Sequence, residues 1–199
     1  MKLLKLTIAG FGPFYESNVI DFAHDLKKHI TIIHGENGSG KTTVLNAILW
    51  CLTGEVSPSM RNDLESSGKK LTAQNLAFKD IDGCMNKLEE RMEVTVEFLF
   101  KKSVYVAKRE GGGAGNLEGQ FYLAIKNSNI QDPFTDPTGV MRRIFPYGVA
   151  RYFMFDGEGF AKSATSGEGS FLSSVKNLLG FGFAEDSIQR LARIRKHLN

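Results

Sequence analysis

One segment of eight residues constrains the fold of this chain more than any other. Residues 35–42 follow the pattern Gly-x-x-x-x-Gly-Lys-Thr. A β-branched run, Ile30-Thr31-Ile32-Ile33, precedes them, and residues of helical spacing follow until Gly54. The expected local structure is therefore a strand, a glycine loop and a helix, which is the arrangement of a phosphate-binding P-loop. The residues expected to bind the nucleotide are Gly35, Glu36, Asn37, Gly38, Ser39, Gly40, Lys41, Thr42 and Thr43.

The residue types of this loop suit a nucleoside triphosphate. Glycines allow backbone N–H groups to point at the β-phosphate, and the ammonium group of Lys41 can reach the β- and γ-phosphates. The hydroxyl of Thr42, at the positive end of the helix, is a ligand for Mg²⁺. ATP and Mg²⁺ are thus the expected cofactors. A decayed P-loop that serves only as a scaffold is the alternative, and the intact Lys41-Thr42 pair argues against it.

A second candidate lies at the end of an apolar strand. Residues 151–155 form this expected strand, and Asp156-Gly157-Glu158 follows it. A carboxylate in this position can bind Mg²⁺ or hold the attacking water. The segment fits a Walker B strand or a nucleotide-sensing loop between lobes, and in the simplest alternative Asp156 only caps a following helix. The candidate catalytic residues are therefore Lys41, Thr42 and Asp156, with Thr42 and Asp156 as metal ligands.

The remaining sequence predicts one domain of the α/β class. Alternating residues predict a β-hairpin near the N-terminus and an antiparallel meander that packs against the P-loop core. The expected strands are 2–11, 19–22, 93–98, 103–107 and 120–125. A surface insertion is expected over 55–91, where the periodicity weakens, and a short helix over 140–145. Helical spacing at 171–179 and 184–198 is still continuing at Asn199, which indicates a truncated chain.

Composition leaves the partner open. The 199 residues carry 25 Lys and Arg against 22 Asp and Glu, so the net charge of +3 does not by itself indicate nucleic-acid binding. Cys51 and Cys84 lack the spacing of a zinc site or a disulfide framework. The sequence shows neither a signal-peptide core nor a long apolar stretch, so we expect a cytoplasmic protein without a membrane partner.

Several motifs together resemble a known family. They are Leu6-Thr7-Ile8, Gly10-Phe11-Gly12-Pro13-Phe14, Ile20-Asp21-Phe22, the segment 32–42, Leu45-Asn46-Ala47-Ile48, the segment 152–158 and Ser174 to Gly180. This set resembles the N-terminal half of the ABC-type ATPase heads of the SMC, SbcC and RecF group. Within the group, Phe153 to Glu158 looks most like DndD, the ATPase associated with DNA phosphorothioation, and SbcC is the close runner-up.

The resemblance implies a shared active site. Residues 1–183 would be the N-terminal lobe of an ABC ATPase head, and 184–199 the start of a coiled-coil helix. The implied partners are the C-terminal lobe of the same head, a second head in an ATP-dependent dimer, DNA, and modification or nuclease subunits. Asp156 stands where many relatives have the glutamine of the Q-loop, so the resemblance favours a sensing role over Walker B. Many relatives also have an arginine where this chain has Gly12.

Two other classes of protein remain open at this point. A free-standing P-loop kinase would use Asp156 as a catalytic base or as the Walker B carboxylate, and it would turn over ATP without another lobe. A scaffold that does not hydrolyse ATP would show no nucleotide-dependent change in DNA binding or dimerisation. In the head of an ABC ATPase, by contrast, this lobe alone would bind ATP and hydrolyse it weakly or not at all.

Overall fold

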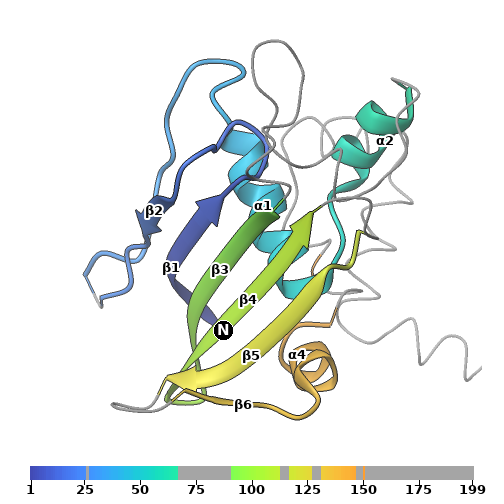
Figure 1. Cartoon of the computed structure of the whole chain (residues 1–199). Helices are drawn as coiled ribbons and strands as arrows, with labels where there is room; N and C mark the ends of the chain where they lie inside the picture. Colours follow the sequence, from blue (N-terminus) through green and yellow to red (C-terminus); the bar gives the residue numbers. More distant parts are fainter. Residues whose placement is uncertain (26, 67–90, 113–116, 127–130, 147–149, 151–199) are drawn as a thin grey trace, which may run out of the picture.

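The computed structural model describes residues 1–25, 27–66, 91–112, 117–126, 131–146 and 150. These residues form an α/β fold in which helices cover one face of an antiparallel sheet. The strands are β1 (Lys2–Ala9), β2 (Asn18–Asp21), β3 (Arg91–Phe100), β4 (Ser103–Gly112), β5 (Gln120–Lys126) and β6 (Gln131–Pro133). The helices are α1 (Lys41–Thr53), α2 (Pro58–Ser66) and α4 (Pro137–Ile144). The six strands have the order β2-β1-β3-β4-β5-β6 (Figure 1).

The meander forms because apolar and polar residues alternate along its strands. On β3, the side chains of Met92, Val94, Val96 and Phe98 are fully buried, and the residues between them are half-buried. Neighbouring strands continue this inward face, since Leu6 of β1 lies opposite Val96. The expected hairpin and meander are therefore confirmed, and β6 is an additional edge strand that the sequence analysis did not predict.

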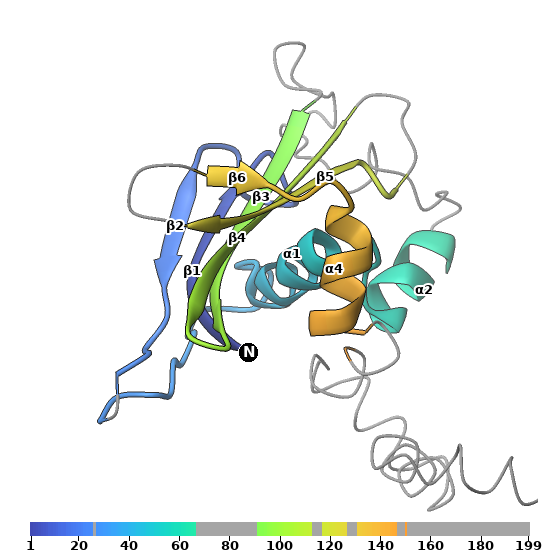
Figure 2. The same cartoon turned by 90° about the horizontal axis from the view of Figure 1, so that it is seen from below.

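Helix α1 supplies the other half of the core. Figure 2 shows α1, α2 and α4 on the same side of the sheet. Trp50 of α1 is fully buried, and its ring centroid lies 5.5 Å from that of Phe11, which follows β1. The helix ends where the sequence predicts, because the backbone N–H of Gly54 donates to the carbonyl of Trp50 at 2.8 Å. The expected helix over 140–145 corresponds to α4.

The strand expected before the P-loop is not formed, and this prediction was wrong for the described structure. Ile30, Ile32 and Ile33 are 72%, 85% and 40% exposed. None of the described strands pairs with this run. An apolar, β-branched run becomes a strand only where a neighbouring strand satisfies its backbone groups and a layer covers its side chains. Residue type predicts only a preference for the strand conformation, and the tertiary structure decides whether both conditions are met.

The insertion expected over 55–91 also needs correction at its start. Val56 and Ser57 are only 1% and 2% exposed, and α2 follows them directly. The chain therefore returns to the core immediately after α1. Residues 67–90 lie outside the described structure, as do Asp156, Glu158 and the segments 171–179 and 184–199. Among the helices of the described residues, none is long and apolar enough to cross a membrane.

Candidate functional site

The P-loop adopts a backbone that depends on its glycines. Gly38 and Gly40 have φ angles of 82° and 94°, which side chains other than that of glycine rarely adopt. The loop is closed by a hydrogen bond from the N–H of Ser39 to the carbonyl of Glu36, at 3.2 Å. Gly40 is the N-cap of α1, so the left-handed turn leads directly into the helix. The loop and the helix start form one continuous structural element.

The start of α1 is open to an anionic ligand. The first N–H groups of a helix have no partner within the helix, and together they carry a partial positive charge. In the described part of the chain, no side chain caps the N-terminus of α1 with a hydrogen bond, and the first turn of the helix contains no acidic residue. Thr42 is exposed in this turn, and Thr43 is half-buried. These features suit a phosphate group, with the Thr42 hydroxyl available to a bound Mg²⁺.

Lys41 lies folded over the loop. Its Nζ donates to the carbonyl oxygens of Gly35 and Glu36, at 2.8 Å and 2.6 Å. These acceptors are neutral, so the positive charge of Lys41 has no carboxylate partner in these contacts. A phosphate that enters the loop would offer the ammonium group a stronger, charge-assisted hydrogen bond. The lysine is thus held within reach of the place where the β- and γ-phosphates are expected.

A buried asparagine fixes the first turn of α1, and the sequence analysis did not assign it this role. Asn46 is fully buried, and its Nδ2 donates to the carbonyl of Thr42 at 2.9 Å. Its Oδ1 accepts from the backbone N–H of Ser57 at 2.7 Å. The amide therefore links the helix turn that carries Thr42 to the segment that begins α2. One signal was available, because Asn46 interrupts an otherwise apolar run.

The other end of α1 is anchored by a buried cation that the sequence analysis also missed. Arg109 is 5% exposed, and its Nε donates to the carbonyl of Cys51 at 2.9 Å. A second guanidinium nitrogen donates to the carbonyl of Glu118. The guanidinium lies 4.5 Å from the ring centroid of Phe121, a cation–π contact. Burial lowers the pKa of Arg109, and the carbonyl oxygens and the ring compensate in part for the lost hydration.

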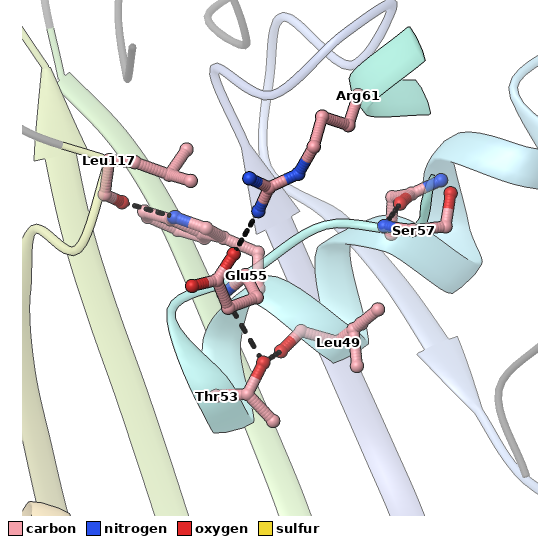
Figure 3. Close-up of polar contacts among 8 residues, drawn as sticks. Leu49, Thr53, Glu55, Ser57, Arg61 and Leu117 are labelled. Atoms are coloured by element: carbon pink, nitrogen blue, oxygen red, sulfur yellow. Dashed lines mark hydrogen bonds and ion pairs between the residues drawn. The ribbon is translucent and has the colours of Figure 1, made fainter. Parts of the chain in front are cut away.

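Further hydrogen bonds hold α1 and the segment after it (Figure 3). Trp50 Nε1 donates to the carbonyl of Leu117 at 2.7 Å, which connects the helix to the segment that precedes β5. The Thr53 hydroxyl bonds the Leu49 carbonyl at 2.6 Å, and Arg61 of α2 forms an ion pair with Glu55. The C-terminal half of α1 is thus attached to β4 and to the segment that precedes β5.

The described structure contains only part of the predicted site. It places residues 35–43 in one loop and helix start, whereas Asp156 lies outside the described residues. The described part of the chain shows no group of three or more His, Cys, Asp or Glu residues that could hold a metal ion. Mg²⁺ at a P-loop does not need such a group, because it uses one or two protein ligands together with phosphate oxygens and water.

Comparison with known proteins agrees with this geometry. Residues 5–175 match the family model described as AAA domain. The SbcC subunit of the nuclease SbcCD from Staphylococcus aureus strain MRSA252 is 33% identical over 113 residues, which are 56% of this chain and 9% of that protein. The same protein from strain JH9 matches with the same identity and coverage. The chain therefore spans about a tenth of the length of these curated relatives. It belongs to the AAA domain family, and its sequence is similar to ATPases of the SMC/SbcC type.

Proposed function

We propose that this chain is the ATP-binding half of an SMC-like ABC ATPase head, which couples ATP binding and hydrolysis to the processing of DNA. One observation supports the proposal most strongly: the uncapped start of α1 with Lys41 held beside it. The N–H groups of the loop and of the first helix turn would bind the β-phosphate. Lys41 would leave the carbonyls of Gly35 and Glu36 for the β- and γ-phosphates.

Mg²⁺ would neutralise charge on the β- and γ-phosphates once bound. The Thr42 hydroxyl would provide one protein ligand, and Asn46 would hold the backbone of that turn in place through the Thr42 carbonyl. Asp156 would approach the γ-phosphate as a sensor, in the position of the Q-loop glutamine. This last role depends on sequence resemblance alone.

The exposed run before the P-loop supports the idea that another lobe completes the fold. Ile30 and Ile32 expose most of their side chains, although both are strongly apolar. Full burial of such a side chain contributes about 1.5–3 kcal/mol. A partner that pairs with this run and covers its isoleucine side chains would therefore be bound with substantial free energy. The C-terminal lobe of the same head is the partner we propose here. A second head would then complete the ATP site, and hydrolysis would require both.

The face of the sheet that points away from the helices, here called the outer face, is a poor candidate for the DNA contact. Lys108 forms ion pairs with Glu93 and Glu110, at 2.9 Å and 2.7 Å, and Lys126 pairs with Glu97 at 2.8 Å. Lysines that are already paired with carboxylates offer little net positive charge to a phosphate backbone. We therefore propose that DNA is bound elsewhere on the engaged heads.

Two pathways fit this proposal. The identity with the SbcC subunit of SbcCD favours an SbcC-like role beside a DNA repair nuclease. The sequence Phe153 to Glu158 favours a DndD-like role in DNA phosphorothioation. A deletion strain distinguishes them, because loss of the protein would affect phosphorothioate content in the second case and processing of DNA ends in the first.

Substitution of Lys41 tests the nucleotide site. We expect Lys41→Ala to weaken ATP affinity by at least about 100-fold, roughly 2.7 kcal/mol, because it removes the cation from the phosphates. Lys28→Ala is a matched control, since Lys28 is an exposed lysine outside the P-loop. Titration with a fluorescent ATP analogue measures both. Equal affinity in Lys41→Ala and the unmodified protein would contradict the proposal.

The concentration dependence of turnover separates the head from a free-standing kinase. A site shared by two heads predicts ATPase activity per chain that rises with protein concentration. A kinase that acts alone predicts constant activity per chain and phosphate transfer to an acceptor. The measurement requires the full-length protein.

A further inference from the structure

We propose that the turn formed by residues 10–15, here called the N-terminal turn, positions the P-loop for nucleotide binding, with Gly12 and Phe14 as its positioning residues. This inference rests on the proposed function, because it assigns a role at the same ATP site. The turn connects β1 to β2 and passes beside the start of α1 (Figure 1). It lies far from the P-loop in sequence order but directly against it in space.

The N-terminal turn is itself a closed structure. The backbone N–H groups of Phe11 and Phe14 donate to each other's carbonyl oxygens, each at 3.1 Å. The N–H of Gly10 donates to the carbonyl of Tyr15 at 3.2 Å. Phe11 is fully buried against Trp50. The core therefore fixes one side of the turn, and its backbone hydrogen bonds carry that position to the other side.

The other side of the turn contacts the last glycine of the P-loop. A Cβ atom placed on Gly40 would lie 2.9 Å from Cγ of Pro13 and 3.1 Å from Cζ of Phe14. The N-terminal turn thus packs against the residue at which the loop becomes helix. Movement of this turn would displace Gly40 and the N–H groups that follow it.

A second contact links the turn to the first turn of α1. Gly12 has a φ of 56°, and a Cβ atom placed on it would lie 2.5 Å from the Cγ2 methyl of Thr43. That distance is shorter than real Cβ contacts, so either the N-terminal turn or Thr43 must shift when Gly12 gains a side chain. Thr43 follows Thr42 directly, so a shift of the backbone at Thr43 would also move the proposed Mg²⁺ ligand. Displacements of about 1 Å are large for a phosphate site that depends on the direction of its N–H groups.

A double-mutant cycle tests this inference in the full chain. Gly12→Ala should weaken affinity for Mg²⁺-ATP by about tenfold, or 1.4 kcal/mol. In a Thr43→Ser background the methyl group is absent, the next atoms of residue 43 lie at 3.5 Å or more, and the same change should cost less than about threefold. The cycle subtracts whatever effect Thr43→Ser has alone. Equal losses in both backgrounds would overturn the proposal.

Gly54→Ala provides a matched control for backbone strain. Gly54 also has a positive φ, 80°, but a Cβ there would meet its nearest neighbour at 3.5 Å, at the far end of α1. Both alanine variants should lower the melting temperature, and only Gly12→Ala should weaken ATP binding. A Gly12→Ala protein that melts earlier yet binds ATP normally would show that the turn is merely structural.

Phe14→Leu covers the case in which Gly12→Ala does not fold. Leucine keeps the apolar character of the position and lacks the ring atoms that reach Gly40, so affinity should fall about threefold. Unchanged affinity in a folded Phe14→Leu protein would count against the proposal. Titration of Lys41→Ala in parallel distinguishes the two levels of inference, since a Lys41→Ala protein that still binds ATP refutes the nucleotide site itself.

Discussion

The buried guanidinium of Arg109 allows a quantitative prediction about stability. Arg109→Met removes hydrogen bonds to the carbonyls of Cys51 and Glu118, and it removes the stacking on Phe121. Hydrogen bonds to a charged group contribute about 1.5–3 kcal/mol each, and a partly desolvated cation–π contact contributes about 1–2 kcal/mol. Methionine also avoids the cost of burying a charge, which is several kcal/mol. The expected net loss is about 2–3 kcal/mol.

Arg109→Lys separates charge from geometry. Lysine keeps the positive charge, but a single ammonium group cannot reproduce the planar fork that reaches both carbonyls and stacks on the ring. We expect a loss of about 1–2 kcal/mol. Urea unfolding at constant m-value measures the change in the free energy of unfolding. Arg61→Met is the matched control, because the Arg61 side chain is 39% exposed in its ion pair and should contribute less than about 1 kcal/mol.

Two results would refute this reasoning about Arg109. If Arg109→Met were more stable than the unmodified protein, the cost of burying the charge would exceed the gain from its contacts. If Arg109→Lys were as stable as the unmodified protein, the fork geometry would not matter. The first result would remove the argument that Arg109 anchors the C-terminal end of α1 to the sheet, and the second would remove the argument that this anchor requires a guanidinium group.

Other residues allow simpler tests. Asn46→Ala should destabilise the protein by about 2–3 kcal/mol in urea unfolding, because it leaves the N–H of Ser57 buried without an acceptor, and a loss below about 0.5 kcal/mol would contradict this. Burial raises the pKa of the Cys51 thiol to about 12, so a variant with Cys51 as its only cysteine should react with a thiol reagent at least about a hundredfold more slowly when folded than when unfolded. As the pH rises, the Cys51 thiol ionises first in the unfolded protein, whose thiol has the ordinary pKa of 9.0. The free energy of unfolding should therefore fall between pH 9.0 and about pH 12. Cys51→Ala should lack this fall when its unfolding is measured over the same pH range. Lys126→Ala should change the free energy of unfolding by less than about 1 kcal/mol, since the Lys126 side chain is 49% exposed in its ion pair with Glu97, and a larger loss in urea unfolding would reveal a wider network.

Local patterns predicted much of the described fold. The alternation along β3, β4 and β5 identified the meander, and Gly54 identified the end of α1. The same alternation also places Arg109 on the inward face, between Ala107 and Gly111, yet a charged residue at that position carries no indication of how its burial is compensated. The carbonyl oxygens that accept from Arg109 lie on helix α1 and in the loop before β5, and only the folded chain brings them close to β4.

The candidate site shows the same division. The motif predicts a site at residues 35–43, and the glycine loop and helix start are formed there because a P-loop is a local structure. Sequence patterns did not reveal that Asn46 ties the Thr42 carbonyl to Ser57, or that Pro13 and Phe14 contact Gly40. The contact of Pro13 and Phe14 with Gly40 joins segments that are distant in sequence, and in both cases packing selects the partner.

The sequence by itself determined the glycine loop, its helix and the antiparallel pairing of the meander, because each depends on residues a few positions apart or on simple alternation. Only the tertiary structure decided that Ile30 to Ile33 remains unpaired in the described fold and that the N-terminal turn lies against the P-loop. The physical reason is that a strand requires a partner for its backbone groups, and a close contact requires an opposing surface. Residue type predicts a preference for such a neighbour but not its presence.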